Sequence, residues 1–496
     1  MTRPSSWARR AMVSTSSPLA VQAGLWALAE GGSAVDAAIA SDAVLGVVQP
    51  FWTGIGGDLF CLVCDGDGVA AFNGSGPAPA GLDRAACEAA ARTRPGLPAW
   101  MADDFPATLP DTSALAVTVP GAVDGWVRLS ARFGRLPLGR VLEPARRLAA
   151  DGFPVGPVAA STWGRWSPKL RRGSPIPAEV HAGQRLTNPP LAASLAAIGA
   201  GGRAAHYEGA WAAEVVAAVQ SEGGVLTAAD LASHAGEWTT PICGSYRGLE
   251  VVEHPPNGQG AAVLAALDIL DRTPAAPSAV DRLVQQVVAI RDGMRLAHRH
   301  VADPASAAVP EFWRRGDTVY TAVVADGVAV SLISSVFHGF GTGITAGGAA
   351  LHNRGLGFSL DARSPNCVAA GKRPFHTIIP ALVRRDGRLW AVFGVVGGPM
   401  QPQGQVQVLA HVVDGGLDSQ AALDAPRARW LGGDVVALED GLGPEAAAAL
   451  EAAGLRVFEH PLPPGELGAG QLIRVHDDGW LEGGADSRRD GVAFGA

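Results

Sequence analysis

The chain lacks the features that would place it in a membrane or on a nucleic acid. No run approaches the roughly 18 uninterrupted apolar residues that a membrane-spanning helix needs. Lysine occurs only at Lys169 and Lys372, no basic stripe with interleaved aromatic residues is present, and the net charge is −8. Because nucleic-acid binding depends on clustered positive charge, we expect neither a membrane nor a nucleic acid as a partner.

The beginning of the chain also lacks a secretory pattern. The segment MTRPSSWARRAMVSTSSPLA is basic, but it contains no apolar stretch of the length that a signal peptide needs. The five cysteines, an odd number, do not suggest a disulfide framework and fit a reducing compartment. The sequence therefore predicts a cytoplasmic protein.

Patterns typical of a metal or nucleotide site are equally scarce. Cys61 and Cys64 form a single C-x-x-C, without the second pair of ligands that a zinc site requires. His298 and His300 have no acidic or cysteine ligands at metal-binding spacing, so packing or surface roles are favoured. The Gly-rich segment Gly54–Asp58 does not connect a strand to a helix and is interpreted as a tight turn. We expect no metal and no other cofactor.

Apolar material, by contrast, is sufficient for a large core, since 48% of the 496 residues are hydrophobic and 17% are charged. A dense β region is predicted from about 303 to 412, after a mainly helical part. Loops rich in Pro, Trp and Arg at about 92–112 and 160–186 are candidate lids. Helices are predicted in two stretches of 18–48, the second capped by Ser33, and over 121–134, 138–151, 190–199, 209–222, 227–234, 260–271, 279–301, 418–425 and 444–453.

The strongest short-range signal is a β-hairpin. Two β-rich runs, Thr318–Ala325 and Val328–Val336, flank the turn dipeptide Asp326–Gly327. The numbers of opposed residues then add up to 653, the sum for Asp326 and Gly327, so Thr318 faces Ser335. Their Cβ atoms are expected about 4.5–5.5 Å apart. The spacing alone favours an ordinary threonine–serine cross-strand pair.

Long motifs follow one another along nearly the whole chain. Those of the first half are AMVSTSSPLAVQAGLWALAEGGSAVDAAIASDAVLGVVQPFWTGIGGD, VPGAVDGWVRLSARFGRLPLGRVLEPARRLAADGFPV and YEGAWAAEVVAAVQSEGGVLTAADLASH. Those of the second half are GFGTGITAGGAALHNRGLGFS, GKRPFHTIIP and GGPMQPQGQVQVLAHVVDGGLDSQAALDAPRARW. In the order and spacing of these motifs the chain resembles the γ-glutamyltranspeptidase family of N-terminal-nucleophile hydrolases, most closely its cephalosporin-acylase-like branch.

This resemblance implies an α+β fold, a four-layer αββα sandwich, and a precursor that cleaves itself. Thr318 matches the family's nucleophile, so the bond between Asp317 and Thr318 is the expected cleavage site. The products are a large α subunit, 1–317, with helical segments and the candidate lids, and a small β subunit, 318–496, together one intertwined domain. The resemblance also implies an α/β heterodimer, or a dimer of such heterodimers, that acts on a small-molecule acyl substrate.

There is a physical reason why a threonine nucleophile should lie at the N-terminus of a chain. A threonine hydroxyl is a weak nucleophile until a base takes its proton, and an α-amine with a pKa near 7.7–8.0 is partly neutral at neutral pH. Cleavage would thus create the base on the same residue as the nucleophile. The resemblance assigns Ser335 to orient this amine, and Gly397–Gly398, after the strand LWAVFGVV, to the oxyanion hole.

This sequence departs from the pattern of true γ-glutamyl enzymes at positions of the acyl-binding pocket. Asn73 stands where that pattern has arginine, Phe337 where it has asparagine, and Gly357 where it has an acidic residue. Arg354 replaces a glutamine, and His376–Thr377 replace paired serines. The carboxylate that would bind the substrate's amine is missing, and an unpaired ammonium in a partly dry pocket is costly.

We hypothesise that Arg354, His376 and Asn73 bind a different acyl group, such as a glutaryl group that ends in a carboxylate. Phe337 and Thr377 belong to the same expected substrate site. The alternatives for single residues are a structural ion pair for Arg354 and a packing role for His376.

An acylase, amidohydrolase or acyltransferase that forms an acyl-enzyme on Thr318 is the favoured function. The alternatives are a γ-glutamyl hydrolase or transferase, and a biosynthetic homologue that cleaves C–C or other unusual bonds. An alternative from a different class is an unprocessed, catalytically silent binding or scaffold protein. Its support is the stretch between Asp303 and Thr318, which is shorter than the family's usual linker.

Overall fold

Two antiparallel sheets of seven strands each form the middle of the molecule. This computed structural model describes residues 3–92, 108–303, 317–460, 462 and 465–496. Sheet I contains, in spatial order, β1 (Ser6–Ala8), β20 (Leu481–Ala485), β19 (Ala469–Val475), β15 (Arg388–Val396), β14 (Ala381–Arg385), β9 (Leu249–Glu253) and β8 (Ile242–Tyr246). Sheet II contains β21 (Val492–Gly495), β2 (Ala11–Thr15), β10 (Asp317–Ala325), β11 (Val328–Phe337), β3 (Asp58–Asp65), β4 (Gly68–Asn73) and β7 (Glu237–Thr239).

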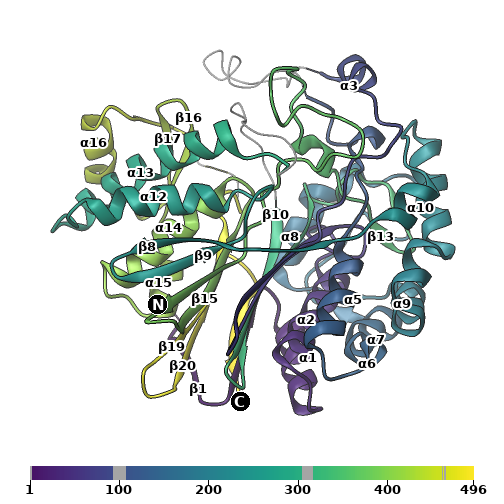
Figure 1. Ribbon diagram of the computed structural model, residues 1–496, viewed down its shortest axis with the longest axis horizontal. Coiled ribbons are helices and arrows are strands. Elements are labelled where there is room, and N and C mark those ends of the chain that lie inside the picture. Colours follow the sequence, from purple (N-terminus) through teal and green to yellow (C-terminus); the bar gives the residue numbers. More distant parts are fainter. Residues whose placement is uncertain (1–2, 93–107, 304–316, 461, 463–464) are drawn as a thin grey trace.

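Helices cover the outer face of each sheet, so the molecule has four layers (Figure 1). Outside sheet I lie α12 (Gly260–Arg272), α13 (Ala279–His300), α14 (Met400–Val413) and α15 (Ser419–Asp424). Outside sheet II lie α1 (Pro18–Ala29), α2 (Ala34–Val48), α5 (Ala122–Phe133), α6 (Leu138–Val141), α7 (Glu143–Asp151), α9 (Pro189–Tyr207) and α10 (Ala210–Ser221). This arrangement confirms the predicted four-layer αββα sandwich.

Shorter elements complete the described chain. They include the helices α3 (Arg84–Ala90), α8 (Pro157–Trp166), α11 (Ala228–Ser233) and α16 (Pro444–Ala452), and the 3-10 turns η1 (Ala114–Ala116), η2 (Ser167–Lys169) and η3 (Arg354–Gly357). Three small sheets pair β5 (Phe153–Pro154) with β6 (Arg185–Leu186), β12 (Thr345–Ala346) with β13 (Ala349–Ala350), and β16 (Ala428–Gly432) with β17 (Val435–Leu438) and β18 (Arg456–Val457).

Three apolar clusters fill the spaces between the layers. The cluster between the sheets joins Phe60, Tyr320 and Ile333 of sheet II to Leu382 and Val392 of sheet I. A second cluster packs α1 and α2 against sheet II, and a third packs α12, α13 and α14 against sheet I. Each large side chain buried in this way contributes about 1.5–3 kcal/mol. Because the central strands are covered on both faces, their sequences are rich in apolar residues without strict alternation.

Strands from both sides of residue 317 are mixed in both sheets. In sheet II, β10 and β11 lie between β2 and β3. In sheet I, β1, β9 and β8 come from the first part of the chain, and the four strands between β1 and β9 come from the second. The two parts of the chain therefore share one core.

The predicted hairpin is present, and its register is confirmed over most of its length. Val319 faces Ser334 and Ala325 faces Val328, and both pairs add up to 653. The register then shifts by one residue, because Asp317 pairs with Phe337. Phe337 has a φ of 73°, a left-handed conformation that is uncommon for a bulky side chain. The expected register is thus wrong by one residue at Asp317, where a bulge ends the ladder beside the predicted nucleophile.

Ser33 caps α2 as predicted, with a reciprocal capping box between its side chain and Asp36. The predicted loop at 160–186 differs from the structure, because α8 occupies its first part. The side chain of Asp490 accepts hydrogen bonds from the N–H groups of Val158 and Ala159, so this helix is capped by a residue far along the chain. The candidate lid at 92–112 lies mostly outside the described residues, as does the linker segment 304–316.

Helix α14 lies in a region that the sequence pattern predicted as β structure. Glutamines occupy alternate positions from 401 to 407, which is typical of a strand. In the structure they form two i, i+4 pairs on a helix that is almost entirely buried. The Gln403 amide binds the backbone N–H and C=O of Trp430, and the Gln407 amide binds those of Ala428. Gln403 and Gln407 therefore pair with the backbone of strand β16 through their side-chain amides.

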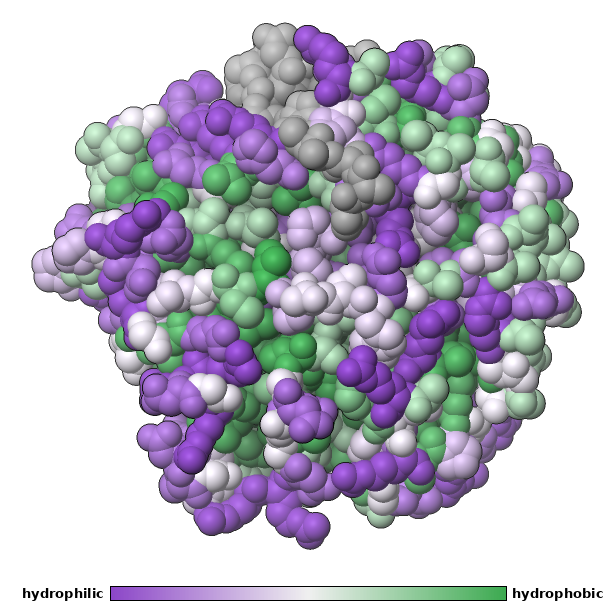
Figure 2. Space-filling model, viewed as in Figure 1, coloured by the Kyte–Doolittle hydropathy of each residue, from purple (hydrophilic) through white to green (hydrophobic). Residues whose placement is uncertain are grey.

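On the face that Figure 2 shows, polar and apolar residues are interspersed. Among the described residues, four large hydrophobic side chains are exposed: Trp7, Leu296, Trp480 and Phe494. None of the described helices is both long and apolar enough to cross a membrane.

The hydrogen bonds between the glutamines of α14 and the backbone of β16 predict an effect on stability. Gln407→Leu leaves the buried N–H and C=O groups of Ala428 without their side-chain partner, so we expect a loss of about 1–3 kcal/mol of unfolding free energy. Gln22→Leu makes the same change on the exposed side of α1 and should stay within about 0.5 kcal/mol of wild type. Denaturant unfolding of wild type and the two variants measures both effects. Equal stability of the two variants would show that the hydrogen bonds of Gln407 to Ala428 do not stabilise the fold.

Candidate active site

The hydroxyl of Thr318 is buried at the open end of the β10–β11 hairpin. The residue is 1% exposed, and its Oγ1 lies 3.5 Å from Ser335 Oγ. The same Oγ1 accepts a hydrogen bond of 3.1 Å from Gln401 Nε2. The structure therefore brings Thr318 and Ser335 together, as the hairpin predicted, and adds Gln401 as a third polar group.

Gln401 belongs to the first turn of α14. Its Oε1 accepts a hydrogen bond of 3.0 Å from the Ile379 N–H, so its Nε2 is the end that faces Thr318. Gln405, one turn later, donates to the Ile379 carbonyl at 2.9 Å. Sequence reasoning missed Gln401, although its place three residues after Gly398 could have drawn attention to it.

Two neighbouring serines on β11 point in different directions. Ser335 Oγ accepts a hydrogen bond of 2.8 Å from the Phe337 N–H at the end of the strand. The Ser334 hydroxyl lies 2.6 Å from Thr53 Oγ1 and donates to Asp42 on α2. Burial raises the pKa of Asp42 to about 6, despite this hydrogen bond. Contacts on both faces thus fix the part of β11 that lies beside Thr318.

Gly397 and Gly398 connect the end of β15 to the start of α14. Their φ angles are 119° and 60°, values that side chains disfavour. A Cβ on Gly397 would also lie 3.0 Å from the Cα of Gly468. Gln259 Nε2 donates to the Gly398 carbonyl at 2.9 Å and so restrains the turn. The two glycines therefore lie at the N-terminal end of a helix, where the helix dipole favours negative charge.

Asp58 is a buried carboxylate that sequence analysis did not identify. It ends the Gly-rich turn at 54–58 and starts β3, where it pairs with Ser335 of β11. Its oxygens meet five partners from distant segments: the N–H groups of Gly76 and Gly121 at 3.4 and 3.3 Å, the rings of His352 and His376 at 3.1 Å each, and Arg354 Nε at 3.6 Å.

These contacts determine the charges of the cluster. Burial alone raises the pKa of Asp58, but the charge and hydrogen bond of His352, together with His376, outweigh it and hold that pKa well below its usual range. Burial, followed by the charge of Arg354, lowers the pKa of His376 to about 3, so this ring is neutral. Burial lowers the pKa of Arg354 to about 9, which leaves it a cation at neutral pH. The cluster thus places a buried carboxylate, Asp58, beside a buried guanidinium, Arg354.

Arg354 keeps hydrogen-bond donors that the protein does not satisfy. Its guanidinium carbon lies 4.1 Å from the ring centroid of Phe337, and its Nη1 donates to Thr377 Oγ1 at 3.1 Å. Its Nη2 has no hydrogen-bond acceptor among the described residues, and its Nε is ion-paired with Asp58 at 3.6 Å, beyond hydrogen-bond distance. Since buried polar groups are normally hydrogen-bonded, unmet donors on a buried cation indicate a place for an anion.

Asn73 and His376 use their polar atoms inside the protein. Asn73 Nδ2 donates to Asn257 Oδ1 at 2.9 Å, and its Oδ1 accepts from the Ser75 N–H at 2.9 Å. The ring of His376 bonds to Asp58 through Nε2 and accepts a backbone N–H at Nδ1. The structure therefore brings Arg354, Phe337 and Thr377 into direct contact, while Asn73 and His376 support their neighbours.

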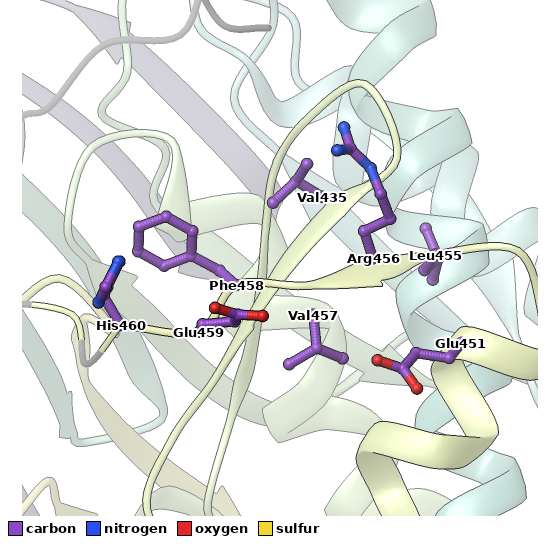
Figure 3. A pocket seen from close by; sticks show the side chains of 8 residues that line it. All are labelled: Val435, Glu451, Leu455, Arg456, Val457, Phe458, Glu459 and His460. Carbon is purple, nitrogen blue, oxygen red and sulfur yellow. The ribbon is translucent and has the colours of Figure 1, made fainter. Parts of the chain in front are cut away.

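The Cys61–Cys64 pair and a pocket near β18 do not belong to the candidate site. Cys61 and Cys64 lie on opposite faces of β3, because Cys61 packs under the helices and Cys64 between the sheets. Within the part of the chain described here, no three His, Cys, Asp or Glu side chains are placed to hold a metal ion. A hollow of about 590 Å³ lies beside β18 and α16 (Figure 3), and none of the predicted site residues lines it.

A four-layer sandwich with Thr318 and Ser335 at one hairpin end is the architecture of the N-terminal-nucleophile hydrolases. A family model described as Gamma-glutamyltranspeptidase matches residues 20–316 and 312–496. The chain therefore belongs to the γ-glutamyltranspeptidase family, as its motifs indicated. It is an enzyme of the hydrolase and acyltransferase class.

The relatives come from several branches of this family. The chain is 34% identical to the glutathione hydrolase-like YwrD proenzyme of Bacillus subtilis (strain 168), over 96% of this chain and 97% of the relative. It is 32% identical to the oxamate amidohydrolase proenzyme of Klebsiella pneumoniae subsp. pneumoniae, with the same two shares covered. The crystal structure of cephalosporin acylase from Bacillus halodurans has a TM-score of 0.91 and 35% identity, covering 100% of this chain and 97% of that one. This likeness confirms the resemblance to the cephalosporin-acylase-like branch.

The low pKa of Asp58 predicts how the stability lost by replacing this residue varies with pH. Asp58→Asn leaves the buried Arg354 cation without its carboxylate, which should cost about 3–5 kcal/mol of unfolding free energy. A depressed carboxyl pKa contributes stability above its unfolded value of about 3.9 and loses it only below that value. The cost should therefore be the same at pH 8 and pH 5.

Unfolding in denaturant at both pH values tests this expectation. Asp67→Asn is the matched control, because it makes the same charge change on an exposed turn of the β3–β4 hairpin. A cost of Asp58→Asn that shrinks between pH 8 and pH 5 would show that the carboxyl titrates in that range and is not held as an anion.

Proposed function

We propose that the chain is the precursor of an N-terminal-threonine acylase that cleaves itself between Asp317 and Thr318. The cleaved enzyme then forms an acyl-enzyme on Thr318 and transfers the acyl group to water or to an amine. The observation that carries this proposal is the buried Thr318 hydroxyl, which lies 3.5 Å from Ser335 Oγ at the start of a central strand. The proenzyme names of the similar proteins support it.

Each site residue has a physical role in this scheme. The α-amine released on Thr318 takes the hydroxyl proton, Oγ1 bonds to the acyl carbon, and the proton passes to the leaving amine as the C–N bond breaks. Ser335 orients that amine. The N–H groups of Gly397 and Gly398 stabilise the oxyanion at the positive end of α14, a contribution that is typically about 2.7–4 kcal/mol for one donor. Water then releases the acyl group from Thr318 by the reverse proton transfers.

Processing gives an α subunit, 1–317, and a β subunit, 318–496, that remain associated. Support for this heterodimer comes from both sheets, since each contains strands from the two sides of residue 317. The small-molecule substrate, the dimer of heterodimers and the cytoplasmic location remain predictions from the sequence.

The acyl group that fits this site carries an anion. Arg354 is a buried cation with unmet donors, and the only carboxylate near it, among the described residues, is Asp58, which it shares with two histidines. A γ-glutamyl group would place its ammonium near this cation, where Gly357 provides no carboxylate to bind it. A glutaryl-like group has the carboxylate without the ammonium. The name of one relative, oxamate amidohydrolase, also describes an amide that carries a carboxylate.

Self-cleavage can be tested on a denaturing gel. Purified wild-type protein should give bands of about 32 and 18 kDa, the 50.7 kDa chain divided by length, and the smaller chain should begin Thr-Val-Tyr. Thr318→Ala should remain a single inactive chain, because it has no hydroxyl to attack the preceding carbonyl. Thr321→Ala, on the same strand, should be processed normally. Full turnover by unprocessed protein or by Thr318→Ala would overturn the proposal.

Acyl specificity can be tested with a panel of anilides. We expect wild-type kcat/KM to be at least about tenfold higher for glutaryl than for γ-glutamyl or pentanoyl anilide. Arg354→Gln should reduce the glutaryl preference over pentanoyl by about 10–100-fold, because a hydrogen bond to a charged group contributes about 1.5–3 kcal/mol. Arg363→Gln, at a side chain that is 89% exposed, should leave the preference unchanged. A γ-glutamyl preference, or an Arg354→Gln variant with unaltered preference, refutes this assignment.

A further inference from the structure

The Thr318 hydroxyl has a second polar neighbour besides Ser335, and this contact has a defined direction. Gln401 Nε2 lies 3.1 Å from Thr318 Oγ1, and both residues are buried. The other end of the amide cannot replace Nε2 there, because Oε1 accepts the hydrogen bond of the Ile379 N–H at 3.0 Å. Gln401 therefore donates to the oxygen of Thr318 and does not accept from it.

The hydrogen-bonding capacity of a hydroxyl makes this direction important. A threonine oxygen has one proton to donate and two lone pairs. Gln401 occupies one lone pair, so the proton is directed elsewhere, toward Ser335 Oγ at 3.5 Å. One lone pair remains for attack on a carbonyl. The contact thus restricts the hydroxyl to orientations in which its proton points away from α14.

We infer that Gln401 is a further catalytic residue, which stabilises negative charge on Thr318 Oγ1; this inference rests on the proposed function. When the α-amine takes the proton of Thr318, Oγ1 gains negative charge as its bond to the acyl carbon forms. In deacylation the same bond breaks, and Oγ1 leaves with that charge until the proton returns. The amide N–H of Gln401 remains hydrogen-bonded to Oγ1 in both steps and is not transferred.

Gln401 also connects the two sides of the reaction centre. The nucleophile lies on β10 of sheet II, whereas Gly397 and Gly398 precede α14, which covers sheet I. Gln401 follows these glycines on the first turn of α14 and reaches across to Thr318. The residue therefore fixes the distance between the attacking oxygen and the N–H groups that would receive the oxyanion.

Gln405, on the same helix, provides a control for a purely structural role of Gln401. Gln405 binds the carbonyl of Ile379, as Gln401 binds its N–H, but among the described residues no hydrogen bond joins Gln405 to Thr318. Gln401→Leu and Gln405→Leu both remove one hydrogen bond to Ile379, whereas only Gln401→Leu removes the donor to the nucleophile. Gln401→Glu keeps the shape and the acceptor for Ile379 while it replaces the donor by an acceptor.

The test compares these three variants with wild type and Thr318→Ala. Wild type and the glutamine variants are incubated until processing stops, and their rates are normalised to the processed fraction seen on a denaturing gel. Thr318→Ala, which should remain a single chain, is assayed at the same total protein concentration. For Gln401→Leu and Gln401→Glu, we expect slower processing and a kcat that is about 10–100-fold lower, with KM within about threefold, because the lost donor acts mainly on charge in the transition state. Gln405→Leu should retain kcat within about threefold.

The outcomes separate this inference from the proposal on which it rests. A Gln401→Glu enzyme with near wild-type kcat overturns the role of Gln401, provided that Thr318→Ala is inactive. Equal losses in Gln401→Leu and Gln405→Leu also overturn it, because they show that only the packing at Ile379 matters. If Gln401→Leu does not fold, the isosteric Gln401→Glu variant decides the question. An active Thr318→Ala variant instead refutes the proposed function itself.

Discussion

The arrangement of the site depends on satisfying one buried carboxylate. Asp58 has no access to water, so its oxygens must meet donors within the protein, and these five donors come from four separate segments, since His352 and Arg354 lie on the same one. Its backbone is paired with Ser335, so the strand beside Thr318 and the guanidinium of Arg354 are placed relative to the same residue. The hydroxyls of Thr318 and Ser335 and the guanidinium of Arg354 are therefore all positioned around one buried carboxylate.

Local patterns in the sequence predicted the part of the site that depends on nearby residues. The turn dipeptide Asp326–Gly327 predicted the register that brings Thr318 close to Ser335. It did not predict the bulge at the open end of the hairpin. The bulge was not predictable, because it depends on the backbone of Phe337. Asp58 was interpreted as the end of a tight turn, since its side-chain partners lie about 300 residues away and no local pattern connects them.

Helix α14 shows why periodicity alone was insufficient. Alternate glutamines indicate a strand only if one face of the element is exposed to water, and α14 has almost no exposed face. Its glutamines are buried because the backbone groups of Ile379, Trp430 and Ala428 need partners at that place. The family resemblance identified the glycines before the helix, but it gave no reason to consider Gln401. Distances between side chains were needed for that.

The mixing of strands from both sides of residue 317 has a consequence for folding. Before the proposed cut after residue 317, the chain folds in a unimolecular process, and the register of both seven-stranded sheets is set while the two parts are covalently joined. After the cut, unfolding would release two polypeptides whose reassembly depends on their concentration. Neither part contains all the strands of either seven-stranded sheet. The mature enzyme would therefore persist because it unfolds slowly, rather than because it refolds easily, and its lifetime becomes a kinetic property of the cleaved state.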